Sequence, residues 1–341
     1  MSERTELEEL GEFGLIDHLT KNIEHYQPST IKGVGDDTAV IDRGDHYELV
    51  TTDMLIEGVH FDMSYTPLKH LGYKAIAVNV SDICAMNGKA TQVTVGIAVS
   101  NRFPVEALEE LYEGMLIACK AYEVDLVGGD TSSSLSGLLI SVNAIGRVDK
   151  NKIAYRSGAK ENDLICVSGD LGAAYIGLQI LEREKSVWKE NPEIQPDLEG
   201  HDYVLERFLK PEPRADINEL FAKENIIPTS MIDISDGLAS EILHLCKSSK
   251  VGAKIYEEKI PVDATVASQC GDFNLEPSVC ALNGGEDYEL LFTIKQSDFE
   301  KINQLTEIKT IGHITDASEG VCLVYPKGEE IFIKAQGWKA F

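Results

Sequence analysis

Apolar and polar positions along the first half of the chain follow two periods, one typical of strands and one of helices. In residues 91–99, larger apolar side chains alternate with small or polar ones, and many are β-branched. Residues 138–145 form a similar run, so both segments are predicted to be strands. Pro104 is expected to open a helix between them. Its apolar stripe consists of Leu108, Leu111, Met115 and Ala118. The run 73–86 is apolar almost throughout, and we expect a buried helix there. A short β-rich run, 47–52, is expected to end at Asp53.

The second half of the chain repeats this alternation of strands and helices. The predicted strands are 163–168, 231–234 and 288–294, and the predicted helices are 171–182 and 237–249. Residues 184–200 are polar and contain two prolines, so we interpret them as a variable loop. Residues 210–214, Lys-Pro-Glu-Pro-Arg, are interpreted as a rigid connector.

This order of elements predicts an α/β (α+β) protein with two domains. Strand gives way to a polar stretch at residues 149–152. We therefore expect an N-terminal domain over 1–148 and a C-terminal domain over 149–341. A length of 341 residues is sufficient for each domain to bury its own core.

Composition and charge exclude several classes of protein. The formal net charge is −26, which argues against sequence-independent binding of nucleic acids, because such binding relies on Lys and Arg. The seven cysteines are scattered, and none forms a C-x-x-C pair, so neither a disulfide scaffold nor a structural zinc site is expected. No apolar run approaches the roughly 20 residues needed to span a bilayer, and the polar N-terminus is not a signal peptide. These features predict a cytoplasmic protein without membrane contact.

The candidate chemistry lies in acidic residues of short glycine-, serine- or threonine-containing motifs, which we interpret as strand ends and loops. These residues are Asp36 and Asp37 in G-V-G-D-D, Asp53 in T-T-D, Asp82 in S-D, Asp130 in G-G-D-T, Asp233 and Asp236 in I-D-I-S-D-G, and Glu286 in G-G-E-D. Mg²⁺ is usually held by one or two carboxylates together with waters and phosphate oxygens. The pattern therefore indicates several Mg²⁺ ions that bind together with a polyphosphate. For Asp82 alone, an internal hydrogen bond is an open alternative, and each glycine pair alone could be a tight turn.

The motifs favour phosphoryl transfer to an acceptor that is itself a phosphate. The chain has no P-loop motif and no protein-kinase motif set, so a nucleotide would be held through metals and backbone amides. A phosphate acceptor is anionic near neutral pH and needs no general base. We therefore expect no catalytic base, and we expect metal ions to offset charge repulsion. A hydrolase that uses paired carboxylates is possible but explains fewer of the motifs.

The motifs, taken in order, resemble those of the thiamine-monophosphate kinases, in the superfamily of aminoimidazole ribonucleotide synthetase and selenophosphate synthetase. The matching stretches are G-E-F (11–13), G-V-G-D-D-T-A-V (33–40), T-T-D-M-L-I-E-G-V-H-F (51–61), K-A-I-A-V-N-V-S-D-I-C-A-M (74–86), G-G-D-T (128–131), R-S-G-A-K (156–160), I-D-I-S-D-G-L (232–238) and G-G-E-D-Y-E-L-L-F-T (284–293). They cover nearly the whole chain. Lys210 stands where the family usually has Arg, and residues 184–200 have no counterpart in the family pattern. The C-terminal tail matches loosely.

The resemblance implies the superfamily's two-domain fold, with mixed sheets flanked by helices, and a homodimer formed mainly through the N-terminal domains. It implies ATP-dependent conversion of thiamine monophosphate to thiamine diphosphate by direct transfer. The implied Mg²⁺ ligands are Asp37, Thr51, Thr52, Asp53, Asp82, Asp130, Asp233 and Asp236. The implied ATP contacts are Tyr122, Gly129, Asp130, Arg156 and Ser235. The implied contacts to thiamine monophosphate are His60, Glu286 and Trp338. Asp36 is a second choice that could orient Asp37 or cap a turn.

Other interpretations are open at this point. Without the resemblance, His60 would be interpreted as structural, Arg156 as a surface cation and Trp338 as a core residue. Other enzymes of the superfamily use a reactive cysteine near one terminus, whereas the first cysteine here is Cys84, inside the predicted buried helix. A regulator that binds nucleotide or thiamine phosphate without catalysis is the third possibility, although it would be expected to have lost some of the acidic residues.

Overall fold

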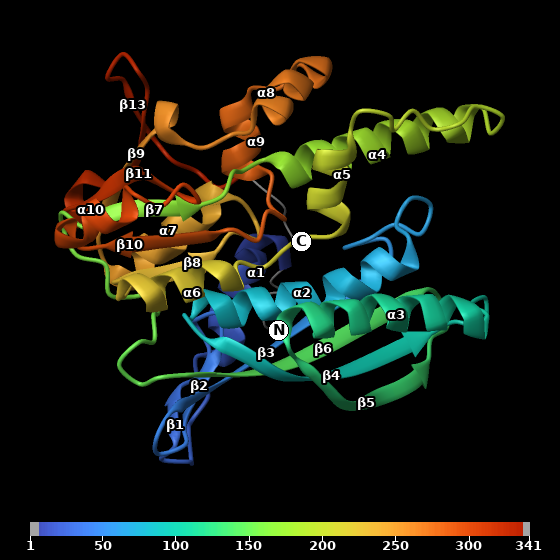
Figure 1. Ribbon diagram of the computed structural model, residues 1–341, viewed down its shortest axis with the longest axis horizontal. Helices are drawn as coiled ribbons and strands as arrows, with labels where there is room; N and C mark the ends of the chain where they lie inside the picture. Colours follow the sequence, from blue (N-terminus) through green and yellow to red (C-terminus); the bar gives the residue numbers. More distant parts are fainter. Residues whose placement is uncertain (1–6, 337–341) are drawn as a thin grey trace, which may run out of the picture.

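A computed structural model describes residues 7–336 of the chain. Two mixed β-sheets with helices between and around them form the described part of the molecule (Figure 1). The predicted α/β class with mixed sheets flanked by helices is confirmed. Within the described residues, no helix is long and apolar enough to cross a membrane.

The first sheet has six strands and lies within the predicted N-terminal domain. In spatial order they are β1 (Thr30–Lys32), β2 (Ala39–Asp42), β3 (Tyr47–Ile56), β6 (Leu138–Val148), β4 (Lys89–Val99) and β5 (Asp125–Ser133). Only β4 and β5 pair in parallel, and β5 is an edge strand. Asp53 and Gly129 were expected at strand ends, but they lie inside β3 and β5, because both strands continue beyond their acidic motifs.

The second sheet has seven strands and lies within the predicted C-terminal domain. In spatial order they are β13 (Glu330–Phe332), β12 (Val321–Val324), β9 (Gly252–Tyr256), β11 (Ile308–Thr315), β7 (Leu164–Ser168), β10 (Leu290–Ile294) and β8 (Ser230–Asp233). Strands β7 and β10 and the edge strand β8 are buried on both faces, which accounts for their largely apolar sequence. One cluster of buried apolar side chains reaches from the first sheet into the second, so the boundary near residue 149 stays a prediction.

Helix α2 (Leu68–Ala85) lies between the two sheets and positions the site (Figure 1). Most of its residues are buried, as predicted, because it packs against strands of both sheets and against α3 (Val105–Tyr122). The two helices approach closely at two glycines. A Cβ atom on Gly72 would lie 1.9 Å from the carbonyl oxygen of Leu111, and one on Gly114 would lie 1.9 Å from that of Lys69. A side chain at either position would therefore push the two helices apart.

The remaining helices surround the second sheet and one end of the molecule. They are α1 (Leu7–Thr20), α4 (Ala173–Glu190), α5 (Asp202–Leu209), α6 (Ala215–Glu224), α7 (Leu238–Ser249), α8 (Ala264–Cys270), α9 (Pro277–Asn283) and α10 (Phe299–Ile302). The predicted loop over 184–200 is wrong in its first part, because α4 continues to Glu190. The residues after Glu182 are mainly Lys, Glu and Arg, which have high helix propensity. The first helix-breaking residue is Pro192, which follows the extended Asn191.

Candidate active site

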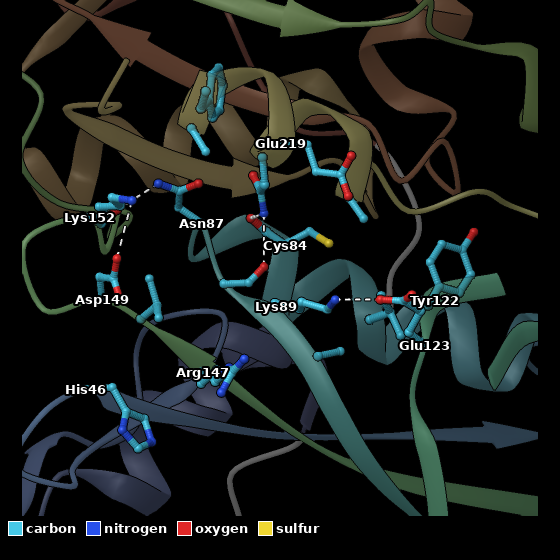
Figure 2. Close-up of a pocket in the computed structure, with 18 of the residues that line it drawn as sticks. His46, Cys84, Asn87, Lys89, Tyr122, Glu123, Arg147, Asp149, Lys152 and Glu219 are labelled. Carbon is cyan, nitrogen blue, oxygen red and sulfur yellow. Dashed lines mark hydrogen bonds and ion pairs between the residues drawn. The ribbon is translucent and has the colours of Figure 1, made fainter. Parts of the chain in front are cut away.

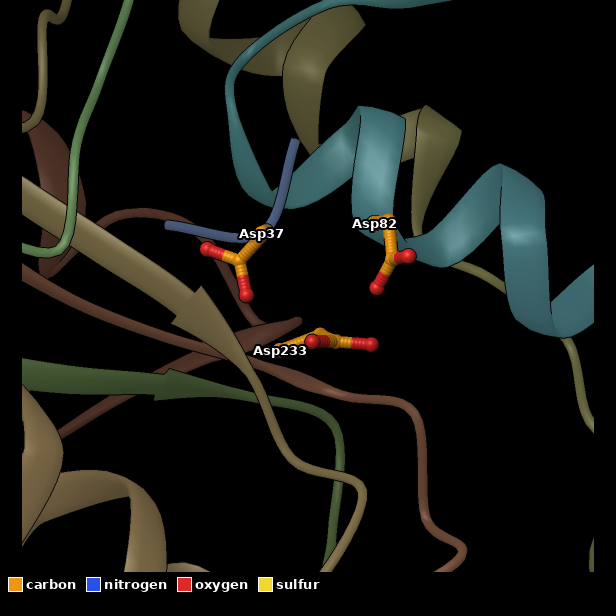
Figure 3. Close-up of side chains that lie close together, drawn as sticks. All are labelled: Asp37, Asp82 and Asp233. Carbon is orange, nitrogen blue, oxygen red and sulfur yellow. The ribbon is translucent and has the colours of Figure 1, made fainter. Parts of the chain in front are cut away.

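Three aspartates from distant parts of the chain lie close together (Figure 3). Asp37 lies in the loop between β1 and β2, Asp82 on α2, and Asp233 at the end of β8. One carboxylate oxygen from each lies within 4.8 Å of the others. The structure thus brings together three of the predicted metal ligands, and it does so where α2 separates the two sheets.

Hydrogen bonds from neighbouring side chains fix the orientation of these carboxylates. The hydroxyl of Thr51 donates to Asp82 Oδ2 at 2.5 Å, and that of Ser81 donates to Asp233 Oδ2 at 2.5 Å. Arg156 donates to Asp37 Oδ1 from Nη2 at 2.6 Å and from Nε at 3.1 Å. Asp37 Oδ2 is buried and has no hydrogen-bond partner among the described residues. An acceptor oxygen left in this state calls for a proton or a cation.

Burial and mutual repulsion disfavour the charged forms of these aspartates. Burial is the main cause that raises the pKa of Asp233 to about 7, and the neighbouring Asp37 raises it further. Burial, followed by the charges of Asp53 and Asp233, raises the pKa of Asp82 well above its usual range. Burial also raises the pKa of Asp37, although Arg156 opposes this shift. A divalent cation would relieve both effects at once.

Asp53 lies beside this cluster on β3. Its backbone N–H donates to Asn79 Oδ1 at 3.1 Å, and Asn79 Nδ2 donates in turn to the carbonyl of Ala75 at 3.1 Å. Asn79 therefore connects the middle of β3 to α2. Burial raises the pKa of Asp53 to about 6. Asp53 thus adds a fourth carboxylate, whose charge affects the pKa of Asp82.

A cavity of about 820 Å³ opens beside the aspartates, with β3 and its following loop on one side and helices α4, α5 and α9 and loops of the second half of the chain on the other. Its lining includes seven of the predicted site residues. They are Asp53, His60, Asp82, Asp233, Ser235, Asp236 and Glu286. Aromatic and aliphatic side chains, among them Tyr65, Tyr175 and Phe208, form much of the remaining wall. The cavity thus combines a carboxylate-rich end with an apolar wall, which suits an organic phosphate.

His60 and Glu286 face this cavity from opposite halves of the chain. His60 Nδ1 accepts a hydrogen bond from the backbone N–H of Ile56 at 3.0 Å, so the neutral ring carries its proton on Nε2. Burial is the main cause that lowers the pKa of His60. Near neutral pH the ring is therefore a neutral donor.

Arg156 and Asp36 support the cluster from the side of the β1–β2 loop. The backbone N–H of Arg156 donates to Asp36 Oδ1 at 3.0 Å, while its guanidinium holds Asp37. Burial raises the pKa of Asp36 to about 6. Asp36 thus orients the segment that carries Arg156, which agrees with its place as a second choice.

The structure places three other predicted site residues away from this cavity. Along β3, Thr51 and Asp53 face α2, whereas Thr52 is exposed on the opposite face. Asp53 pairs with Val142, Val142 with Val95, and Val95 with Gly129. Three strand spacings of about 4.8 Å therefore separate Asp53 from Gly129 within one chain. Asp130, the residue after Gly129 on the edge strand β5, is exposed.

One further predicted residue, Tyr122, also lies apart from the aspartates. Tyr122 lines a separate cavity of about 970 Å³, with Lys89, Arg147 and Glu219 (Figure 2). Its hydroxyl donates to Glu212 of the proline-rich connector, and it lies 2.9 Å from the hydroxyl of Tyr73. Trp338 falls outside the described residues.

Sequence reasoning missed the polar residues that hold the site together. Lys74 forms a buried ion pair with Glu286, and Glu289 accepts hydrogen bonds from Arg214 and Ser168. Asn79, which connects β3 to α2, was also not among the predicted site residues. The available signal was a polar or charged residue in an otherwise apolar run, as for Lys74 in the run 73–86.

Comparisons with known proteins extend over nearly the whole chain. A family model described as AIR synthase related protein, N-terminal domain, matches residues 35–148. Thiamine-monophosphate kinase of Bacillus subtilis (strain 168) is 31% identical over 340 residues, which cover 97% of this chain and 100% of that protein. The enzyme of the same name from Aquifex aeolicus (strain VF5) is 36% identical over 335 residues, which cover 98% and 99%. A solved structure of AaThiL complexed with AMPPCP and TMP is 35% identical, covers 100% of both chains and has a TM-score of 0.85.

Proposed function

Because this chain belongs to the thiamine-monophosphate kinase family, we propose that it transfers the γ-phosphoryl group of ATP to thiamine monophosphate. The products are thiamine diphosphate and ADP. The predicted fold of aminoimidazole ribonucleotide synthetase type and the predicted kinase activity in thiamine biosynthesis are confirmed by the similarity to these kinases. ATP is the phosphoryl donor, and the AaThiL complex with the ATP analogue AMPPCP and with TMP supports both substrates.

One observation of the structure carries this proposal most directly. Asp37, Asp82 and Asp233 converge beside a cavity that is also lined by His60 and Glu286. A phosphoryl transfer between two anionic substrates needs concentrated positive charge, and a group of carboxylates supplies it only by holding cations. The same geometry without cations would repel both substrates.

The residues fit Mg²⁺ as the bound cation. The carboxylates converge from separate elements, and the buried oxygen Asp37 Oδ2 has no partner among the described residues. Hard oxygen ligands of this kind suit Mg²⁺. The proposed ligands on the α2 side are Asp37, Thr51, Asp53, Asp82, Asp233 and Asp236. Bound Mg²⁺ neutralises phosphate charge during in-line transfer.

The protein's own side chains bind and orient the two substrates. No general base is assigned, because the acceptor phosphate is already an anion. The proposed substrate contacts are His60, as a neutral donor through Nε2, and Glu286, whose carboxylate suits a cationic thiazolium ring; Trp338 completes this predicted group. The proposed ATP contacts near the aspartates are Arg156 and Ser235. A positioned guanidinium such as that of Arg156 binds phosphate strongly.

We propose that the enzyme is a homodimer and that a second copy completes the site. Thr52 and Asp130 are proposed metal ligands, and Gly129 is a proposed ATP contact, yet all three are exposed on the open face or edge of the first sheet. Met54, Val127 and Leu135 are exposed on the same strands or in the loop that follows β5. A second copy over this face would bury these apolar side chains and bring its Asp130 toward Thr52, the residue next to Asp53 on β3. The predicted ATP contact Tyr122 has no such support from its position.

The remaining predictions concern organisation and location. One sheet in each half of the chain supports domains over 1–148 and 149–341. All seven cysteines are free and buried, which supports a cytoplasmic location.

The proposed function is tested by incubating the purified protein with ATP, Mg²⁺ and thiamine monophosphate and by separating the thiamine products chromatographically. We expect thiamine diphosphate in amounts equal to ADP, and neither product when Mg²⁺ is chelated. ADP formed without thiamine diphosphate would point to a hydrolase and contradict the proposal.

A further inference from the structure

Lys74 is a buried cation in the middle of the helix that separates the two sheets. Its side chain is 4% exposed, although lysines are almost never fully buried without a partner. It does not line the cavity beside the aspartates. Its charge therefore acts on the site through the groups that it contacts.

Those contacts come from elements far along the chain. The ammonium group forms an ion pair with Glu286 Oε2, lies 3.4 Å from the carbonyl oxygen of Phe208, and lies 4.5 Å from the centroid of the Phe208 ring. Phe208 stands in the last turn of α5, where the helix dipole favours a cation. Lys74 is thus held by groups that stabilise its positive charge.

The backbone of Glu286 is also tightly constrained. Its φ of 63° is in the left-handed region, and its N–H donates to the carbonyl of Ser235 at 2.7 Å. A Cβ atom on the preceding Gly285 would lie 2.6 Å from that same carbonyl oxygen. The backbone turn is therefore fixed against the segment that carries Ser235 and Asp236. The side-chain torsions of Glu286 are fixed by Lys74.

We propose that Lys74 is a positioning residue that sets the affinity for thiamine monophosphate by holding the Glu286 side chain in place and aimed at the substrate. This inference rests on the proposed function. Asp53, Asp82, Asp233 and Asp236 line the same cavity, and their combined charge opposes a further carboxylate. Lys74 offsets that repulsion, because its ammonium group forms an ion pair with Oε2 of Glu286. The Glu286 side chain remains 29% exposed, so its other oxygen can meet a cationic ring in the cavity.

The test is a double-mutant cycle with Lys74→Met, Glu286→Gln and the double variant, measured in the full-length enzyme with Mg²⁺. We expect Lys74→Met to raise KM for thiamine monophosphate about tenfold or more, as for the loss of a charge-assisted contact. The KM for ATP and kcat should change by less than about twofold, because the metal ligands are untouched. The double variant should be no worse than Glu286→Gln alone, since both changes remove one shared interaction.

Lys69→Met is the matched control, because Lys69 is on the same helix but its ion pair with Glu113 is on the surface. It should leave both KM values unchanged. If Lys74→Met does not fold, Lys74→Gln, which keeps a hydrogen-bond donor, replaces it in the cycle. Additive effects of the two single variants, or a fall in kcat with unchanged KM, would overturn the inference. Failure of this inference can be distinguished from failure of the proposed function, because in the second case the wild-type protein would make no thiamine diphosphate.

Discussion

Each aspartate of the cluster serves binding at the expense of folding. After burial, the charge of Asp233 helps to raise the pKa of Asp82, and the charge of Asp37 helps to raise the pKa of Asp233. Residues selected for a bound ligand commonly destabilise the free protein in this way. The aspartates are therefore expected to have opposite effects on stability with and without metal.

Asp82→Asn should stabilise the metal-free protein and abolish its activity. The amide keeps an oxygen that can accept from Thr51, while the charge repelled by Asp53 and Asp233 is removed. In EDTA at pH 8 we expect Tm to rise by about 2–4 °C for each kcal/mol gained. Calorimetry measures the change in Tm, and the assay for thiamine diphosphate measures the loss of activity. A lower Tm in EDTA would contradict the repulsion that we infer.

The effect of Mg²⁺ on stability should depend on pH. The pKa of Asp53 is raised to about 6 and that of Asp233 to about 7, so their contribution to stability is present below about pH 4 and is lost as pH rises through these values. Cation binding offsets this loss. The rise in Tm on adding Mg²⁺ should thus be larger at pH 8 than at pH 5, and Asp233→Asn should reduce the difference. An equal rise at both pH values would argue against a metal site at these residues.

At the residue scale, the sequence singled out three aspartates that lie close together in the structure, but it did not show on which face of its element each residue lies. Asp37, Asp82 and Asp233 were predicted as ligands from short motifs, and the structure brings them together. Asp130 was grouped with them because it also follows a glycine pair. Its position on an edge strand depends on strand order, which no local pattern encodes. Lys74 could not be assigned to Glu286 because 212 positions separate them.

At the scale of elements, the turn after α9 is held by a buried charge network. Asp287 accepts from the backbone N–H of Gly172, near the start of α4, at 2.8 Å. Glu289 is 2% exposed and receives hydrogen bonds from Arg214 and Ser168, each at 2.5 Å. Two structural carboxylates thus alternate with Glu286 and Tyr288, both of which have positive φ. The motif G-G-E-D-Y-E therefore contains both residues that line the cavity and residues that stabilise the turn.

Glu289→Gln should destabilise the protein strongly. The guanidinium groups of Arg207 and Arg214 would lose the buried carboxylate with which they pair. Breaking such an ion pair typically costs about 3–5 kcal/mol. A fall in Tm of several degrees is expected by calorimetry. Glu113→Gln, which removes the surface pair with Lys69, is the control and should leave Tm nearly unchanged. Similar small effects of both changes would show that the network does not stabilise the turn.

The sequence predicted most of the larger elements and missed several small ones. Periodic patterns identified α3, α7 and β4, and apolar runs identified α2, β6, β7, β8 and β10. Helices α1, α5 and α6 and strands β9 and β11 were not predicted. The end of α4 was misplaced because a charged segment was taken for a loop, although its residues favour a helix. Short elements such as β1, β13 and α10 depend on contacts with other parts of the chain, and their sequences alone carry little signal.

At the scale of the whole molecule, the open face of the first sheet is the main feature that one chain leaves unexplained. The strands before and after residue 149 pair only among themselves, in one sheet each, while the two predicted domains stay a prediction. Pairing between two copies is not encoded in any periodic pattern. It was expected only from the family resemblance and stays a prediction.

Mixing two inactive variants tests whether two copies share each site. Asp53→Asn and Asp130→Asn should each be inactive, because each removes a proposed charged ligand. If Asp130 comes from the second copy, co-expression should restore about a quarter of wild-type activity, because half of the dimers are mixed and each has one intact site. Separately purified variants that are simply combined, without subunit exchange, are the control. No restoration in verified mixed dimers would place both residues in the site of one chain.

Direct transfer of the γ-phosphoryl group to the substrate phosphate is the central claim, and ATP labelled in that group tests it most directly. With thiamine monophosphate present, we predict that the label appears in the terminal phosphate of thiamine diphosphate. With ATP alone, the denatured protein should carry no label, because in our proposal the aspartates bind metal ions and do not act as nucleophiles. Thiamine without its phosphate should accept the label very poorly, since no base is assigned to deprotonate its hydroxyl. Label on the protein before the acceptor is added, or thiamine phosphorylated as fast as its monophosphate, would contradict this account.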